Sequence, residues 1–205
     1  MSMGHRTAEE LEVGLAAVRE SPRDAGRLDM IVSRPAVGER QVRAEATLDL
    51  TDGLVGDSWR LRPSSRMPNR APHPDMQLNV MSTRVIALVA GDRSRWQLAG
   101  DQLFVDFDLS EVNVPPGTRL AIGSAVIEVT DQPHTGCGKF VERFGVAAMT
   151  LVNSPIGRAL HLRGINAKVV RPGQIRVGDT VLKQAPVGQT PDPVVPVSHV
   201  GAAGD

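Results

Sequence analysis

The sequence predicts a mainly β fold with a few short helices, arranged as a β-barrel or a strongly bent sheet. Three observations lead to this prediction. From residue 102 onward, short apolar runs alternate with turns rich in Gly and Pro, a pattern typical of all-β domains. Segments with helical periodicity are few and short. The 205 residues are enough for one globular domain with its own core.

The first segment with helical periodicity spans residues 7–20. Apolar residues from Leu11 to Val18 follow one helical face, and Thr7 with Glu10 three residues later is a capping-box signature. We therefore expect residues 1–26 to form an N-terminal helical extension. The main domain then spans residues 27–185, and residues 186–205, rich in Pro, Gly, Ala and Val, are expected to form a disordered tail.

Short apolar runs predict the remaining elements in chain order. The expected strands are residues 28–33, 41–50, 103–109, 119–122, 125–130, 165–170, 174–177 and 180–182. Gly123-Ser124 and Pro172-Gly173 are each expected to turn a hairpin. Residues 82–90 fit a helix or a strand, residues 92–99 fit a helical turn or two that ends at Gly100, and residues 146–152 fit a helix.

Residues 51–79 form a long irregular segment. It contains Pro63, Pro68, Pro72 and Pro74 and the arginines Arg60, Arg62, Arg66 and Arg70. A loop of this length without regular structure is unusual unless it has a function, so a binding loop or lid is one interpretation. A disordered surface excursion fits equally well on length alone.

Composition excludes several classes of function. Lys plus Arg equals Asp plus Glu at 23 each, and only six residues are aromatic, none of them Tyr, so we expect no nucleic-acid partner. A single cysteine excludes an internal disulfide and a multi-cysteine zinc site, and it favours a reducing, cytoplasmic compartment. No apolar stretch approaches the roughly 20 residues of a membrane span, so no membrane association is expected.

The single cysteine, Cys137, is the candidate chemical centre. It lies in the loop His134-Thr135-Gly136-Cys137-Gly138-Lys139, directly after an apolar strand, and Arg143 follows. Its glycine neighbours allow close approach of a ligand, and the nearby cations favour the thiolate. We therefore expect a reactive or metal-binding cysteine; the alternative is an inert, buried small side chain.

Arg163 precedes the last long strand and is a second candidate. If Ile165, Ala167 and Val169 face the core, Asn166 and Lys168 face outward. The planar guanidinium of Arg163 would then stand at the mouth of the strand, where it can hold an anionic group. An ordinary solvated strand face with a surface arginine is the alternative.

Several of these segments together resemble the MOSC domain, the module named for the C-terminus of molybdenum cofactor sulfurase. The resemblance spans roughly residues 27–183. It runs through Gly53-Leu54-Val55-Gly56-Asp57, residues 79–81, residues 103–113 before Pro116-Gly117, Pro133-His134-Thr135-Gly136-Cys137, Arg163-Gly164-Ile165-Asn166-Ala167-Lys168-Val169-Val170, Gly173 and Gly178-Asp179.

The resemblance implies a MOSC-type β-barrel, similar to the barrel domain of pyruvate kinase, with a cleft for the molybdenum cofactor, molybdopterin. Cys137 would coordinate the metal or carry sulfur, since a soft thiolate suits this metal. His134, Lys139 and Arg143 would set the charge around the sulfur. Arg163 and the cluster Arg60, Arg66 and Arg70 would hold the pterin phosphate.

Three functions are compatible with this resemblance in a stand-alone member of the family, which lacks the N-terminal β-barrel domain of the amidoxime-reducing members. The first is a molybdenum-dependent oxidoreductase that reduces small N-oxygenated compounds with electrons from a separate redox partner. The second is a sulfur transferase in which a Cys137 persulfide is delivered to an acceptor enzyme. The third is a non-catalytic scaffold.

Overall fold

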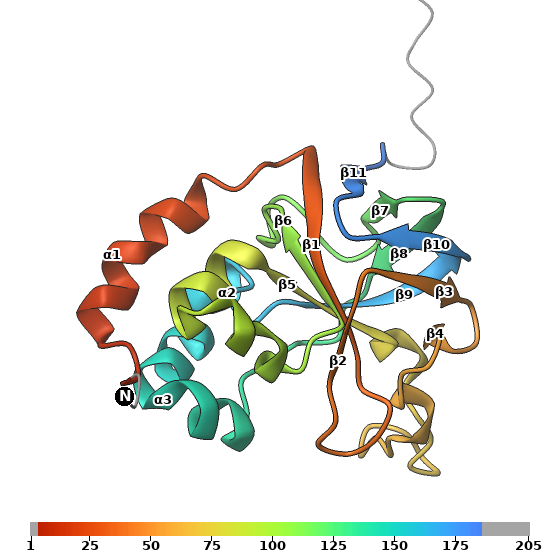
Figure 1. Cartoon of the computed structure of the whole chain (residues 1–205), viewed down its shortest axis with the longest axis horizontal. Helices are drawn as coiled ribbons and strands as arrows, with labels where there is room; N and C mark the ends of the chain where they lie inside the picture. The colour runs from red at the N-terminus through yellow and green to blue at the C-terminus, as the bar shows by residue number, and fades with distance from the viewer. Residues whose placement is uncertain (1–3, 186–205) are drawn as a thin grey trace, which may run out of the picture.

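A closed seven-stranded β-barrel forms the centre of the molecule (Figure 1). The structure is a computed structural model that describes residues 4–185, so the expected tail at 186–205 lies outside the described residues. Around the barrel the order is β11-β7-β8-β9-β5-β6-β1, and pairing of β1 with β11 closes it. These strands are β1 (Ala25–Ser33), β5 (Leu78–Ser82), β6 (Leu103–Asp106), β7 (Arg119–Ile122), β8 (Ala125–Val129), β9 (Ile165–Arg171) and β11 (Thr180–Lys183).

The barrel is mixed because one strand pair is parallel. β5 and β6 run parallel, and the chain between them crosses over through α2 (Thr83–Ala90) and the 3-10 helix η3 (Arg93–Ala99). The other barrel pairs are antiparallel, including the hairpin of β7 and β8. The predicted hairpin at Gly123-Ser124 is therefore confirmed.

A small three-stranded sheet packs beside the barrel. Its order is β10 (Gly173–Arg176), β3 (Glu45–Asp49), β4 (Gly53–Leu54), while β2 (Gln41–Arg43) extends the barrel edge beside β1. The predicted hairpin at Pro172-Gly173 is wrong, because β10 pairs with β3 and not with β9. Gln174 instead bonds the turn of the preceding hairpin, with its N–H 2.8 Å from Ser124 Oγ, and this interaction carries the chain away from β9.

The helices gather on the opposite side of the barrel from the small sheet (Figure 1). α1 (Ala8–Arg19) begins with the predicted capping box of Thr7 and Glu10. Residues 82–90, which fit a helix or a strand in the sequence, contain the helix α2. η3 ends at Gly100, which has a left-handed conformation, as predicted. α3 (Gly138–Asn153) includes the predicted helix at 146–152, and α4 (Pro155–Ala159) follows it. The irregular segment 51–79 contains two short 3-10 helices, η1 (Trp59–Leu61) and η2 (Pro74–Met76).

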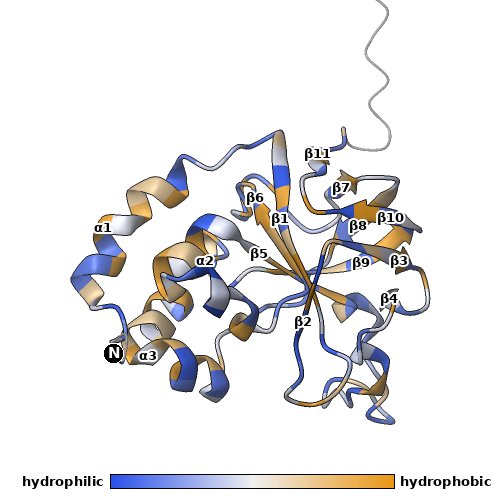
Figure 2. Ribbon diagram, in the orientation of Figure 1, coloured by the Kyte–Doolittle hydropathy of each residue, from blue (hydrophilic) through white to orange (hydrophobic). Residues whose placement is uncertain are grey.

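Two apolar cores stabilise this arrangement. One fills the barrel with aliphatic side chains and Phe107, and the second lies between the barrel and the helices around Phe104, Phe140 and Phe144. Figure 2 shows the apolar colour concentrated along the barrel strands and the polar colour on β2 and the outer loops. No helix within residues 4–185 is long and apolar enough to cross a membrane.

Asn166 points away from the barrel core that contains its neighbours Ile165 and Ala167, as expected, but the side chain is not exposed to solvent there. It is fully buried. Its Oδ1 accepts a 2.7 Å hydrogen bond from Asn79 Nδ2, and its Nδ2 donates to the Gln132 carbonyl oxygen at 3.1 Å. The loop after β8 therefore covers this face of β9, whereas Lys168 remains half-buried and pairs with Asp75 at 3.0 Å.

Candidate functional site

Cys137 lies between strand β8 and helix α3, as the N-cap of that helix. Its backbone is extended, and its carbonyl oxygen accepts the N–H of Phe140 at 2.8 Å. Its side chain caps no amide and is exposed to solvent. The thiol is therefore free for chemistry, and the helix N-terminus places partial positive charge close to it.

The second half of α3 holds the cysteine loop in place. The N–H of Gly136 donates to Asn153 Oδ1 at 3.1 Å. A Cβ atom at Gly136 would overlap Met149 Sδ and come within 3.2 Å of Val152 Cγ2. The absence of a side chain at Gly136 lets the loop lie close against α3, and this contact helps to position the next residue, Cys137.

Cys137 opens onto a cavity of about 350 Å³ that we call the basic chamber. Six cationic side chains line it: Arg34, Arg40, Arg62, Lys139, Arg143 and Arg163. Two of them have buried carboxylate partners. Arg34 Nε lies 2.8 Å from Asp57 Oδ2, and Arg163 Nη1 lies 2.8 Å from Asp101 Oδ2. Across residues 4–185 the other four have no carboxylate partner, so four positive charges in the chamber are unbalanced.

Burial and, to a smaller extent, neighbouring positive charges lower the pKa of two chamber arginines. Burial, together with the charge of Arg34, lowers the pKa of Arg62 to about 10. Burial followed by the charges of Arg143 and Arg34 also lowers the pKa of Arg40. The Nε atom of Arg40 is buried and has no hydrogen-bond partner among the described residues. A bound anion would relieve this repulsion and satisfy that donor.

A second cavity of about 340 Å³ adjoins the basic chamber, because Arg34, Arg62 and Asn79 line both. Its outer wall comes from the irregular segment 51–79, which contributes Arg66 among other residues. Arg66 Nη1 donates to Gln132 Oε1 at 2.9 Å and so connects this segment to the loop after β8. The segment therefore forms one wall of the second cavity, and its role as a binding loop stays a prediction.

His134 lines the second cavity from the cysteine loop. Its Nδ1 lies 3.5 Å from Asp101 Oδ1. Burial lowers the pKa of His134 well below its usual 6.5, and the charges of Arg163 and Arg34 act in the same direction. The imidazole is therefore neutral at pH 7 and adds a hydrogen-bonding group to the site, with no positive charge. Burial likewise raises the pKa of Asp101, against the opposing effect of Arg163.

The structure brings together most of the residues that the sequence singles out. Cys137, Lys139, Arg143 and Arg163 line the basic chamber, and His134 and Arg66 line the second cavity. Arg60 and Arg70 line neither cavity. Arg60 is exposed and pairs with Asp52 at 2.7 Å, and Arg70 is exposed with a positive φ of 53°.

Sequence reasoning missed Arg34, Arg40 and Asn79. Arg34 follows directly on the buried end of β1, and a charged residue at that position was a usable signal. Asn79 alternates with buried residues in β5, but nothing local shows that its side chain bonds Arg34 and Asn166. Arg40 lies in an exposed turn after β1, and only the fold places it beside Arg143.

The match to a known family decides the identity of the domain. A family model described as the MOSC domain matches residues 70–182, more than half of the chain. The chain belongs to the MOSC domain family. This family is associated with binding of the molybdenum cofactor. The comparison with curated protein sequences gives no significant match.

Solved structures of low sequence identity share the fold of this MOSC domain. The YuaD protein from Bacillus subtilis is 18% identical with a TM-score of 0.56, over 77% of this chain and 94% of that one. YiiM from Escherichia coli is 23% identical with a TM-score of 0.50, over 80% of this chain and 72% of that one. At these identities the likeness establishes the MOSC barrel and nothing finer.

The residues of this MOSC domain fit the cofactor of its family. Within the described part of the chain, no group of three or more His, Cys, Asp or Glu side chains is placed to hold a metal ion. A metal bound at Cys137 would therefore need further ligands from outside the protein. The two sulfur atoms of a pterin dithiolene would be such ligands. The unbalanced cations and the unpartnered Arg40 Nε match an anionic phosphate. Each of the two cavities lies at the lower end of the usual range for cofactor sites.

Proposed function

We propose that this MOSC domain binds the molybdenum cofactor in the basic chamber, with Cys137 Sγ as the protein ligand of the metal. The observation that carries the proposal is the exposed, uncapped thiol at the edge of a cavity with four unbalanced cations. A thiol supplies the soft ligand, and guanidinium groups supply planar donors for phosphate oxygens.

Three of the four unbalanced cations are assigned to the phosphate of the cofactor. Arg40, Arg62 and Arg143 line the chamber together with Lys139, which lies two residues after Cys137. We assign the phosphate to the three arginines, because their charges already repel one another and an anion between them removes that repulsion. Arg34 and Arg163 are held by buried carboxylates and position the chamber walls.

The proposed reaction is the two-electron reduction of a small N-oxygenated compound. A hydroxylamine, for example, takes up two electrons and two protons, its N–O bond breaks, and an amine and water leave. When bound, the cofactor supplies a metal that exchanges the two electrons. The electrons come from a separate redox partner, because a chain with one cysteine cannot ligate an iron–sulfur cluster alone. We assign the relay of a proton to His134, because its imidazole lines the adjoining cavity and, when neutral, has one nitrogen that donates and one that accepts.

One observation favours a second function, that of a sulfur carrier. Cys137 is exposed and is the only cysteine of the chain, so no internal thiol can attack a persulfide on it and release sulfide. In transfer, a nucleophile of the acceptor enzyme attacks the outer sulfur, the S–S bond breaks, and the Cys137 thiolate remains.

Metal and pterin analysis of the full chain, purified from a host that makes the cofactor, tests these proposals. We expect about one molybdenum per chain in the wild type. Cys137→Ala should lose the metal, because the only protein ligand is gone. Arg40→Ala should lower the content of pterin as well as of metal, since it removes a group assigned to the phosphate. Arg176→Ala is the matched control, because Arg176 is exposed on β10 and pairs with Glu45 outside both cavities.

The outcomes separate the alternatives. The wild type could contain molybdenum and pterin only at background level and carry sulfur on Cys137 that cyanide releases. This result would rule out the reductase and support the sulfur carrier. Background levels of all three would leave a non-catalytic scaffold. If Arg40→Ala and Arg176→Ala retain pterin equally, the assignment of the phosphate to the chamber arginines is wrong.

A further inference from the structure

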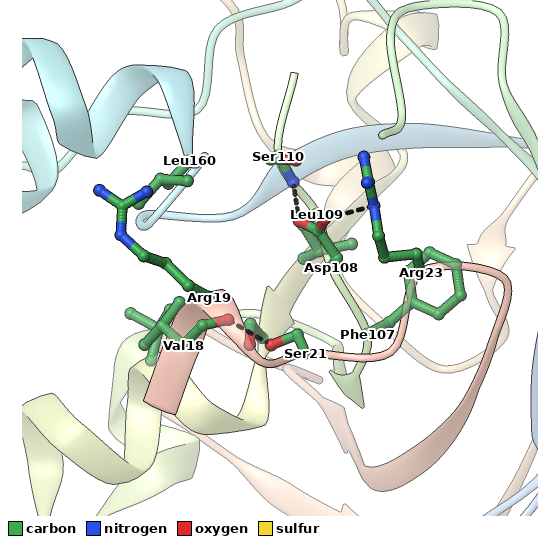
Figure 3. Close-up of a pocket in the computed structure, with 11 residues that line it drawn as sticks. Val18, Arg19, Ser21, Arg23, Phe107, Asp108, Leu109, Ser110 and Leu160 are labelled. Atoms are coloured by element: carbon green, nitrogen blue, oxygen red, sulfur yellow. Dashed lines mark hydrogen bonds and ion pairs between the residues drawn. The ribbon is translucent and has the colours of Figure 1, made fainter. Parts of the chain in front are cut away.

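A separate polar cavity lies at the start of helix α2 (Figure 3). It has a volume of about 220 Å³ and is bounded by the end of α1, the start of α2 and the segment that follows β6. None of the residues that line it lines the basic chamber or the second cavity. The cavity is therefore spatially separate from the proposed cofactor site.

The start of α2 presents hydrogen-bond donors without acceptors. Ser82, the N-cap, has an extended backbone, but its side chain caps no amide, and the first turn contains no acidic residue. The first amides of a helix have no acceptor within the helix and carry partial positive charge. Ser82 lines the cavity, is 4% exposed, and its hydroxyl has no partner within residues 4–185. The neighbouring Thr83 hydroxyl is also buried and unpartnered in this part of the chain.

The charges around the cavity favour an anion. Arg19 lines it from the end of α1, Arg23 from the stretch between α1 and β1, and Asp108 from the segment after β6 (Figure 3). Asp108 is already compensated: its Oδ1 accepts the N–H of Ser110 at 2.9 Å, and its Oδ2 lies 3.5 Å from Arg23 Nε. Arg19 is exposed and has no carboxylate partner among the described residues, so it contributes an uncompensated positive charge to the wall of the cavity.

We propose that this cavity binds a small tetrahedral oxyanion of the phosphate type, either the free ion or the terminal group of a small phosphomonoester. The Ser82 hydroxyl and the first amides of α2 are the donors, and Arg19 supplies the opposing charge. Backbone amides at a helix start combined with a hydroxyl form a well-known anion-binding arrangement. The volume lies below the usual range for larger organic ligands, which restricts the occupant to a small group.

Amide chemical shifts of the full-length protein provide a readout that separates this site from the basic chamber. Inorganic phosphate is titrated against chloride at equal ionic strength. We expect saturable shifts of the Ser82, Thr83, Arg84 and Val85 amides with phosphate and no saturable shifts with chloride. Glycerol 3-phosphate is titrated in parallel: tighter binding than inorganic phosphate identifies a phosphomonoester as the source, and equal or weaker binding identifies the free ion.

Two serine variants make the test specific. Ser82→Ala should weaken phosphate binding at the α2 amides about 10-fold, the usual effect of losing a hydrogen bond to a charged group. Ser21→Ala is the matched control: Ser21 lines the same cavity, but its hydroxyl already donates to the Val18 carbonyl oxygen at 2.7 Å, so binding should be unchanged. The proposal is overturned if the α2 amides do not respond to phosphate, or if the two variants weaken binding equally.

Discussion

Burial, more than sequence position, determines the chemical role of His134. A histidine three residues before Cys137 reads in the sequence as one more cation near the sulfur. In the fold its side chain is almost enclosed and lies near the guanidinium groups of Arg34 and Arg163, which oppose a further positive charge. The site thus combines charged arginines with a neutral imidazole, which can donate or accept a hydrogen bond but adds no positive charge.

The lowered pKa of His134 predicts a pH-dependent stability. In the unfolded chain the imidazole titrates near 6.5, and in the folded protein well below that value. Between the two values the unfolded state binds the extra proton, so the free energy of unfolding falls as the pH drops below 6.5. One such group contributes at most about 1.4 kcal/mol per pH unit.

We therefore expect His134→Gln to flatten the decline in stability on the acid side, as measured by urea unfolding over a pH series. The variant removes the difference in proton binding that the His134 imidazole itself makes between the folded and unfolded states. His5→Gln, which alters an exposed side chain, serves as the control. Equal slopes for His134→Gln and the wild type would contradict the assignment of a neutral, buried imidazole.

At the scale of the element, a kink in α3 lets both halves of this helix contribute residues to the site. Gly145, with φ 88° and ψ 168°, divides α3 into two parts. The first part begins after Cys137 and presents Lys139 and Arg143 to the basic chamber. The second part presents Asn153, which holds the amide of Gly136. A straight helix could not do both, because its second half would continue away from the cysteine loop.

Gly145→Ala should therefore destabilise the protein. The backbone conformation at this position is unfavourable for any residue with a Cβ atom and costs about 1–3 kcal/mol. The new Cβ would also lie 2.8 Å from the His5 side chain. Urea unfolding provides the measurement. Gly138→Ala in the same helix is the matched control, because a Cβ there meets nothing within 4 Å and should cost less than about 0.5 kcal/mol. Equal stability of the two variants would mean that α3 tolerates a different path.

At the scale of the whole molecule, the buried pair of Arg34 and Asp57 joins distant segments into one site. Arg34 follows β1, Asp57 belongs to the irregular segment, and both are at most 3% exposed. Arg34 also donates to Asn79 Oδ1 at 3.0 Å and to the Gly100 carbonyl oxygen at 2.8 Å. Four parts of the chain therefore meet at one guanidinium group, which forms a wall common to both cavities.

Asp57→Asn should cost about 3–5 kcal/mol of unfolding free energy, because it leaves the Arg34 charge buried without a counterion. Denaturant unfolding measures the loss. Asp52→Asn is the comparison, since Asp52 pairs with Arg60 at an exposed position and such a pair contributes at most about 1 kcal/mol. A loss at Asp57 no larger than that at Asp52 would show that the pair does not hold the segments together.

The sequence by itself determined the local features of this protein. The capping box at Thr7, the end of η3 at Gly100 and the hairpin at Gly123 all depend on residues within a few positions of one another. The same holds for Lys139, which shares the chamber with Cys137 because the two are neighbours in the chain. Glycine, proline and capping residues act over this short range, and their patterns are therefore readable without a fold.

Only the tertiary structure decided which charges meet and which are buried. Arg40 reaches Arg143 across about half of the chain, Asn166 turns out to be enclosed, and the segment after Pro172 leaves the barrel for a second sheet. Closing a barrel brings together residues that are far apart in the chain, and burial then removes the solvent that would screen their charges. The charge balance of the basic chamber and the protonation state of His134 are consequences of barrel closure. A local sequence pattern therefore cannot predict them.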